Sequence, residues 1–324
     1  MKKRRIITRR RALVAGGTIV AGGALTVGGL VSYDQHQRFA RDAQRSIPDH
    51  RVKLPASTPK MVIARGTDPA LNVRASVERL GGMSRFIAPN DVVVIKPNIG
   101  WERTEEQAAT THPEVVAEVV RLCRDTRAAR VIVSDCPVKN SRKAFVVSGI
   151  QKAAADAGAE VIAPEDSRYH TVQISDRLGT WDVLEPFVIA TKVINVPVAK
   201  NHSLTGVVAG MKNWIGITGK LRIGFHGDLQ RSIAELAAMM NPTLTVIDAS
   251  RVLMHNGPEG GNVEDVKQIN AVAAGTDPVA LDTWAFGLVG KPLNQMPDYL
   301  RLAQENGLGQ IDYRALQPLE IITG

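Results

Sequence analysis

The segment VINVPVAKNHSLTGVVAGMKNWIGITGK, residues 193–220, joins a short apolar run to a dense set of polar side chains. The run Val193–Val196 is typical of a buried strand, which Pro197 ends. The residues that follow include Lys200, Asn201, His202, Lys212 and Asn213. Lysine and histidine are rarely fully buried without a partner, and open α/β sheets place their sites at the carboxyl ends of strands. We therefore expect a polar site here, the alternative being a well-packed helix with a polar rim.

The rest of the chain repeats this alternation of apolar runs and helical stretches from Met61 onward. The pattern predicts an α/β domain over residues 60–324, with a mostly parallel sheet and helices on both faces. The predicted strands include Met61–Arg65, Asp91–Asn98, Arg130–Asp135, Leu244–Asp248 and Ile269–Gly275. The predicted helices include Pro113–Asp125, Ser141–Ala157 with a break at Ser148–Gly149, Leu229–Met240 and a helix from Pro278 to Leu288. The region after Pro164, up to Ile189, has no clear pattern.

Polar groups follow several of the predicted strands. Lys96 and Asn98 end one strand, Asp135 and Cys136 follow the next, and Asp248 ends a later one. Lys96 is either a snorkelling side chain or an anion ligand. Cys136 is either a reactive or metal-binding thiol or a buried structural cysteine.

The spacing between His202 and Lys212 limits how they can act together. If one unbroken helix ran from His202 to Lys212, these two residues would lie about 15 Å apart along its axis. Gly206 and Gly210 on that helix would allow another backbone to approach closely. His202 and Lys212 share a site only if His202 stays in a loop and the chain folds back. For an enzyme, we predict the catalytic groups Lys212, His202, Lys96 and Asp248, the ligand-binding groups Asn98, Lys200, Asn213 and Asp135, and the metal ligands His226 and Cys136. The alternative is a protein that binds an anionic or metal-bound ligand without turnover.

The amino terminus is basic and then apolar. Its first eleven residues hold Lys2, Lys3, Arg4, Arg5, Arg9, Arg10 and Arg11, and the run Ala12–Val31 contains six glycines. The sequence around Arg9 and Arg10 resembles a twin-arginine signal, so residues 1–31 predict export by the twin-arginine machinery to the periplasm or cell exterior. The alternative is an uncleaved anchor, because about 20 apolar residues can span a bilayer. Residues 32–59 are interpreted as a charged helix and a linker.

The net charge of +8 comes almost entirely from this segment. Residues 1–31 contain seven basic and no acidic side chains, which leaves 33 basic against 32 acidic residues, or +1, for the remainder. A near-neutral domain offers no general electrostatic footprint for nucleic acid, so that class of partner is excluded.

Two cysteines in an exported chain raise the question of a disulfide. Cys123 lies near the end of the predicted helix Pro113–Asp125, close to the loop before the next strand. That strand, Arg130–Asp135, carries Cys136 about 17 Å from the start of the strand, at ~3.3 Å per residue. A disulfide needs Cα atoms within about 7 Å, so we expect two free thiols.

Seven segments together resemble one family, the domain of unknown function 362. They are VVVIKPNIG (Val92–Gly100), TTHPEVV (Thr110–Val116), VIVSDCP (Val131–Pro137), INVPVAKNH (Ile194–His202), GMKNWIG (Gly210–Gly216), LTVIDA (Leu244–Ala249) and GTDPVALD (Gly275–Asp282). The resemblance implies the fold but no established activity, and it suggests a link to exported redox systems because many members carry iron–sulfur clusters. This chain's two cysteines cannot hold such a cluster themselves. His112 stands where the family pattern has an acidic or small residue.

A second, local resemblance is to the amino-terminal domain of the nickel-pincer lactate racemases. His202, Lys212, Gly216 and His226 are similar to a histidine, a lysine ten residues on, a glycine and a later histidine there. The resemblance implies an acid/base role for His202, a cofactor-bearing role for Lys212 and metal binding by His226. The proline before the glycine is absent, and the last spacing differs by a couple of residues.

Replacing Arg9 and Arg10 with lysine should leave the protein in the cytoplasm. Lysine keeps the charge but lacks the planar guanidinium, so a machinery that recognises the arginine pair should no longer bind it. Cell fractionation with immunoblotting measures the effect, and the matched control replaces Arg4 and Arg5 with lysine. Normal export of the R9K/R10K protein would exclude the twin-arginine route.

Overall fold

The computed structural model describes residues 45–324. The predicted signal or anchor at residues 1–31, and residues 32–44 of the predicted charged helix, lie outside the described residues. The segment from residue 45 to 59 packs against the domain, since His50 is buried and its carbonyl accepts a hydrogen bond from Thr243. Within residues 45–324, no helix has both the length and the apolar character needed to cross a membrane.

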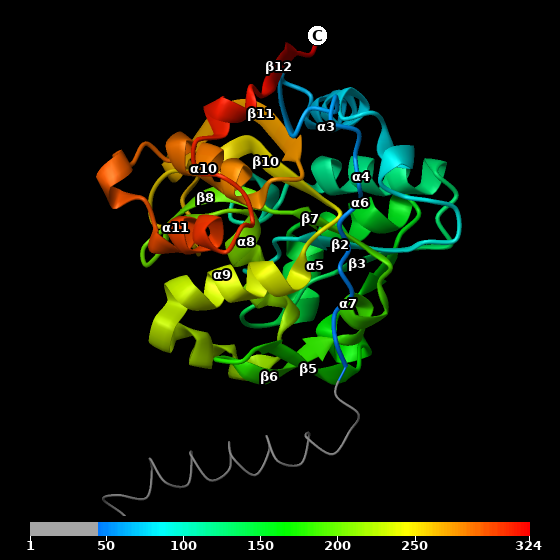
Figure 1. Cartoon of the computed structure of the whole chain (residues 1–324), viewed down its shortest axis with the longest axis vertical. Helices are drawn as coiled ribbons and strands as arrows, with labels where there is room; N and C mark the ends of the chain where they lie inside the picture. Colours follow the sequence, from blue (N-terminus) through cyan, green and yellow to red (C-terminus); the bar gives the residue numbers. More distant parts are fainter. Residues whose placement is uncertain (1–44) are drawn as a thin grey trace, which may run out of the picture. The chain divides into compact units, whose positions relative to one another are not determined.

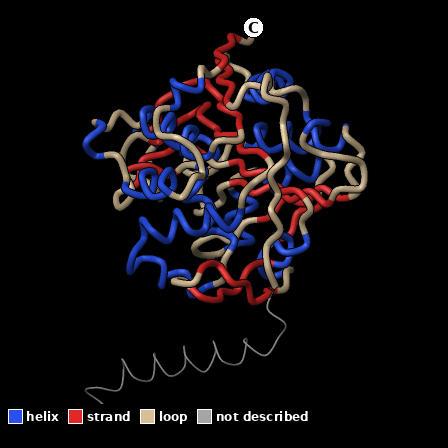
Figure 2. The backbone as a smooth tube through the Cα atoms, viewed as in Figure 1, coloured by secondary structure: helices blue, strands red, loops and turns tan. Residues whose placement is uncertain are grey.

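A mixed, mostly parallel sheet runs through the domain in the order β12-β1-β11-β10-β7-β2-β3-β4. In this order β11 is antiparallel to both of its neighbours, and the remaining neighbours are parallel. Figure 2 shows these strands in red. Their bounds are β1 Met61–Arg65, β2 Val92–Pro97, β3 Arg130–Ser134, β4 Glu160–Ile162, β7 Lys192–Val196, β10 Leu244–Leu253, β11 Val266–Gly275 and β12 Leu319–Ile322.

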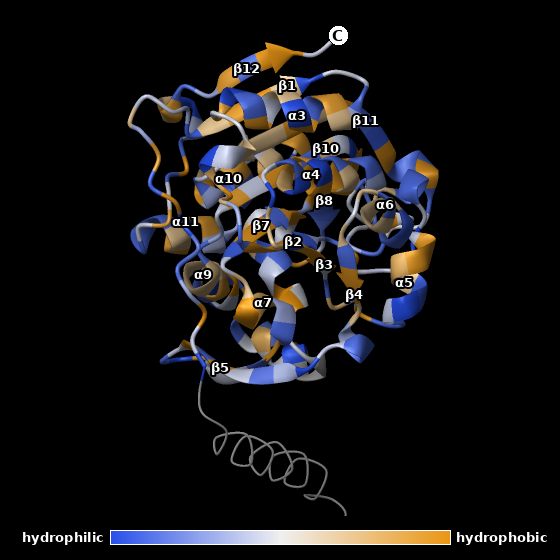
Figure 3. Cartoon of the chain, turned by 90° about the vertical axis from the view of Figure 1, so that its right-hand side faces the viewer, coloured by the Kyte–Doolittle hydropathy of each residue, from blue (hydrophilic) through white to orange (hydrophobic). Residues whose placement is uncertain are grey.

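Helices cover both faces of the sheet, as the alternation of side chains along its strands requires. Val93 and Ile95 of β2 belong to one apolar core, which includes residues of α3, α4, α5 and α6, whereas Val94 belongs to a second core with α7, α9 and α11. Figures 1 and 3 show β7, β2 and β3 between α4 on one side and α7 and α9 on the other. The bounds are α3 Pro69–Arg79, α4 Pro113–Asp125, α5 Ser141–Val147, α6 Ile150–Asp156, α7 Glu185–Ile189, α8 Gly210–Asn213, α9 Leu229–Met240, α10 Pro278–Leu288 and α11 Asp298–Glu305.

The sequence signals for helix ends agree closely with the structure. The predicted bounds of α4, α9 and α10 are confirmed, and the side chains of Asp68, His112 and Asp277 each accept a hydrogen bond from the first turn of their helix. The predicted break in the helix after Ser141 is also confirmed. Gly149 there has a φ of 74°, a left-handed conformation that ends α5 before α6 begins.

The expectation of a helix between His202 and Lys212 is wrong. After Pro197 the chain forms β8 (Val198–His202), turns, and returns as β9 (Gly206–Val208), with His202 opposite Gly206. Gly206 has a φ of 73°, which a helix does not accommodate. The fold-back that the two residues need in order to share a site is therefore a β-hairpin.

A second hairpin, of β5 (Tyr169–Ser175) and β6 (Gly179–Leu184), forms a separate two-stranded sheet in the region after Pro164, for which no element was predicted. Its side chains contribute Val172, Ile174, Val183 and Leu184 to the core beside α9. Figure 1 shows this hairpin close to α9 and apart from the main sheet.

The two cysteines are free, as predicted. Cys123 is buried within α4 and Cys136 is buried after β3. Burial raises the pKa of both thiols, so they are protonated at neutral pH.

Asp282 of α10 joins two elements that are far apart in the chain. It is fully buried, and its carboxylate accepts hydrogen bonds from the backbone N–H groups of Gly210 (2.6 Å) and Met211 (3.1 Å) at the start of α8. The hydroxyl of Tyr299 donates a third bond at 3.2 Å. A Cβ at Gly210 would lie 2.9 Å from this carboxylate, so glycine is needed for the approach. Asp282 thereby fixes the helix that carries Lys212.

Replacing Asp282 with alanine should lower the free energy of unfolding by about 2–4 kcal/mol, because three buried donors lose their acceptor. Chemical denaturation followed by circular dichroism measures the change. Asp312→Ala, at an exposed position on the same domain, is the control and should stay within about 0.5 kcal/mol of wild type. Equal stability of both variants would show that Asp282 does not hold α8.

Candidate functional site

A cavity of about 340 Å³ lies at the carboxyl ends of β2, β3 and β8. Open α/β sheets bind ligands at this edge. The structure brings nine of the ten predicted site residues together in its wall, and these are Lys96, Asn98, Asp135, Cys136, Lys200, His202, Lys212, Asn213 and His226.

At the inner end of the cavity, Lys96 and Asp135 form a buried ion pair. The Lys96 ammonium donates to the Asp135 carboxylate at 2.6 Å and to the Pro97 carbonyl at 2.9 Å. The same carboxylate accepts from the backbone N–H groups of Ile99 (2.6 Å) and Cys136 (2.8 Å). Burial lowers the pKa of Lys96, and the Asp135 charge opposes that shift. The pair therefore joins the ends of β2 and β3.

Gly216 lies directly against this ion pair. A Cβ at this position would lie 2.4 Å from the Asp135 carboxylate and 2.9 Å from the Lys96 ammonium. Its carbonyl accepts a hydrogen bond from the Cys136 N–H at 2.8 Å. Only glycine lets the segment after α8 close over the two charges without displacing them.

Three asparagines connect the ion pair to the neighbouring strands. Asn213 accepts from Lys96 (3.1 Å) and Asn98 (3.0 Å), and its amide donates to Asn195 at 2.9 Å. Asn195 in turn donates to the Gly210 carbonyl at 2.7 Å. The network satisfies the buried amides and positions α8 over the strand ends.

Lys200 of β8 is almost completely buried and faces neutral oxygens. Its ammonium donates to the Asn98 side chain at 3.0 Å and to the Ala109 carbonyl. Burial, reinforced by the charge of Lys212, lowers the pKa of Lys200 to about 7. The side chain therefore gains and loses a proton near neutral pH.

Lys212 of α8 has no hydrogen-bond or ion-pair partner among residues 45–324, although it lines the same cavity. Burial, with a contribution from the Arg222 charge, lowers the pKa of Lys212 to about 8. A desolvated ammonium without a partner is energetically unfavourable. Lys212 is thus the cation in this wall that has neither a hydrogen-bond acceptor nor an ion-pair partner among the described residues.

His202 lies at the end of β8 with its ring orientation fixed. Its Nδ1 accepts from the backbone N–H groups of Leu204 (3.0 Å) and Thr205 (3.2 Å), so the ring proton is on Nε2. Burial lowers the pKa of His202 to about 2, and the charges of Lys212 and Lys200 act in the same direction. At neutral pH this histidine is an uncharged hydrogen-bond donor.

The outer part of the cavity wall combines a cation with apolar side chains. Arg222 donates to the carbonyls of Cys136 and Pro137, both at 2.5 Å, and so holds the segment Lys220–Asp228 against the end of β3. Val138 and Leu204 also line the cavity and are 49% and 63% exposed. Arg222, Val138 and Leu204 are not among the ten predicted site residues. The basic side chains between Gly216 and Gly227 are a sequence signal for Arg222, whereas the apolar residues have none.

Asp248, the tenth predicted residue, does not line this cavity. Its carboxylate accepts from the backbone N–H of His112 at 2.7 Å and from the N–H and hydroxyl of Ser250 at 2.9 and 2.6 Å. One carboxylate oxygen therefore holds the loop before α4 onto β10, and the other accepts from Ser250 within β10, which continues past Asp248 to Leu253.

The metal-ligand role predicted for His226 and Cys136 is not tested by this arrangement. Within residues 45–324, no three or more His, Cys, Asp and Glu side chains are grouped so that they could hold a metal ion.

Similar chains are found among curated proteins and among solved structures. Over 220 residues this chain is 27% identical to the thylakoid-associated protein sll1697 of Synechocystis sp., which covers 65% of this chain and 67% of that protein. The lactate racemase apoprotein from Thermoanaerobacterium thermosaccharolyticum superposes with a TM-score of 0.43 and 11% identity. That match covers 75% of this chain, which spans 58% of the racemase chain.

A family model matches residues 93–287, a range that includes the whole wall of the cavity. The match extends from β2 to α10 and covers more than half of the chain. The chain therefore belongs to the family described as Domain of unknown function (DUF362).

Proposed function

We propose that this cavity binds a small anionic ligand, and that the ammonium of Lys212 is its counter-ion. The observation that carries the proposal is the uncompensated Lys212 in the cavity wall. An anionic group on the ligand would supply the missing partner.

The charge balance of the cavity supports the same ligand class. Its wall contains the cations Lys96, Lys200, Lys212 and Arg222 but a single carboxylate, Asp135, which Lys96 already engages. Positive charge in excess within a partly desolvated cavity favours a carboxylate or phosphate group. The Nε2–H of His202 adds a neutral donor, and the apolar side chains at the rim accommodate the uncharged part of the ligand.

We further propose that the site is an enzyme active site, with Lys212 as the group that transfers a proton or attacks a carbonyl. An amine with a pKa of about 8 is partly unprotonated near neutral pH and can do either. His202, with a pKa of about 2, acts as a hydrogen-bond donor in this proposal rather than as the acid/base predicted from sequence. Lys96 and Asp135 position the ligand-binding groups.

The alternative is a binding protein without turnover, an accessory of an exported redox system. The hydrogen bonds that fix Lys96, Asn98 and Asn213 favour it, because a rigid wall can hold a ligand without any chemical step. Conversion of a captured ligand by the purified protein would distinguish the two functions. For either function we propose export by the twin-arginine route, which the arginine pair and the glycine-rich run at the amino terminus support.

Lys212→Met should remove the bound ligand without weakening the fold. Methionine keeps the apolar stem, and removing an unpartnered desolvated charge should leave the free energy of unfolding at about pH 7 equal to or above that of wild type. Native mass spectrometry with elemental analysis, on protein purified from its own host, compares the bound species. Lys152→Met, an exposed position on α6, is the matched control. A folded Lys212→Met protein with unchanged ligand content would contradict the proposal.

Anion affinity should fall in two steps as the pH rises. Lys200 loses its proton around pH 7 and Lys212 around pH 8, and each loss removes a positive charge that attracts the ligand. Calorimetric titration with sulfate and pyruvate, whose charges are constant between about pH 6 and about pH 9.5, measures this profile. Lys212→Met should bind more weakly and show a single step, at a higher pH than the Lys200 step of wild type because the Lys212 charge no longer lowers the pKa of Lys200. A dissociation constant that does not change over this range would exclude both lysines as counter-ions.

A further inference from the structure

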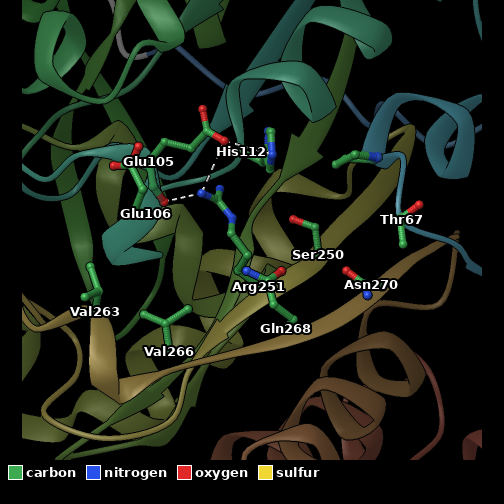
Figure 4. Close-up of a pocket in the computed structure, with 11 residues that line it drawn as sticks. Thr67, Glu105, Glu106, His112, Ser250, Arg251, Val263, Val266, Gln268 and Asn270 are labelled. Atoms are coloured by element: carbon green, nitrogen blue, oxygen red, sulfur yellow. Dashed lines mark hydrogen bonds and ion pairs between the residues drawn. The ribbon is translucent and has the colours of Figure 1, made fainter.

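A second cavity, of about 410 Å³, is lined by β10, β11 and the loop that precedes α4. Figure 4 shows its side chains, with Arg251 reaching from β10 toward Glu105 and His112. None of its lining residues also lines the lysine-rich cavity.

Irregular pairing of two strands places Arg251 in this wall. The register of β10 with β11 shifts between Ala249 and Arg251, and Asn270 on the facing strand has a φ of 54°. Such a bulge re-aims the side chains beside it. Arg251, beside this shift, is 6% exposed and points toward Glu105.

One end of the Arg251 guanidinium is already engaged. Its Nη1 donates to the Glu105 backbone carbonyl and lies 3.5 Å from the Glu105 carboxylate. The same carboxylate lies 3.0 Å from Nε2 of His112, whose Nδ1 accepts from the Glu114 N–H. The single negative charge of Glu105 therefore interacts with both Arg251 and His112.

The other edge of the guanidinium has no partner. Nε and Nη2 of Arg251 are buried and form no hydrogen bond with any residue from 45 to 324. These two N–H groups point in parallel and match the two oxygens of a carboxylate. Buried donors without acceptors are unfavourable, more so on a charged group. We propose that this cavity is a second ligand site, at which Nε and Nη2 of Arg251 bind the carboxylate of a small molecule.

The remaining wall selects the rest of the ligand. Gln268, Asn270 and Thr67 offer neutral donors and acceptors, and Glu106 adds an acidic acceptor. Two acidic side chains in the same wall, Glu105 and Glu106, repel a dianion such as a phosphate monoester. The ligand is therefore a monocarboxylate with a hydroxyl or amino group close to the carboxylate, and the site is independent of the function proposed for the lysine-rich cavity.

The experiment uses the full-length Lys212→Met protein, so that anion binding at the other cavity does not contribute. Glycolate and glycine are the probes, and glycolamide and glycinamide are their controls without a carboxylate. We expect one saturable site for at least one acid in calorimetric titration, with affinity at least about tenfold above its amide because the amide cannot accept two charge-assisted bonds. The acid that binds identifies the hydroxyl or the amino class.

Two variants test the role of the arginine. Arg251→Lys keeps the charge but lacks the paired N–H groups, and should weaken acid binding by about tenfold or more. Gln268→Glu adds a repelling charge at an exposed position of the wall and should also weaken it, whereas Gln151→Glu on α6 makes the same change elsewhere and should not. If Arg251→Lys does not fold, Gln268→Glu against Gln151→Glu decides. The proposal is overturned if neither acid binds, if acid and amide bind equally, or if Gln268→Glu leaves acid binding unchanged.

Discussion

The buried ion pair between Lys96 and Asp135 is the interaction on which the rest of the site depends. Two opposite charges removed from water are tolerated only when their remaining hydrogen-bonding capacity is also satisfied. The backbone N–H groups of Ile99 and Cys136 satisfy the carboxylate, and Pro97 and Asn213 accept from the ammonium. The ends of β2 and β3, and the helix α8 through Asn213, are consequently held in one arrangement.

The three lysines of the cavity wall differ in the partners that this arrangement provides. Lys96 has a carboxylate partner and a structural role, whereas Lys200 has neutral partners and Lys212 has none among the described residues. The difference lies in what surrounds each ammonium, since the three side chains are chemically identical. The two lysines that lack a counter-charge have pKa values lowered to about 7 and about 8.

Much of the fold was predictable from sequence because its signals are local. The caps at His112 and Asp277 and the glycine at 149 each act within a few residues, and the predicted elements agree with the structure there. Nine of the ten predicted residues lie in one cavity wall because strand ends converge at one edge of the sheet. Asp248 and the hairpins could not be placed, since their positions depend on which distant strand or helix they contact. The unpaired edge of Arg251 has no sequence signal for the same reason.

The β8–β9 hairpin makes the length of this part of the chain as important as its composition. Lys200 and His202 are two residues apart on β8 and so face the same side, with Val208 and Gly206 as their cross-strand neighbours. Inserting or deleting one residue within β8 would rotate one of these side chains away from the cavity. Homologues that retain the site should therefore tolerate substitutions between positions 198 and 208 more readily than insertions or deletions, and alignment gaps should fall outside this segment.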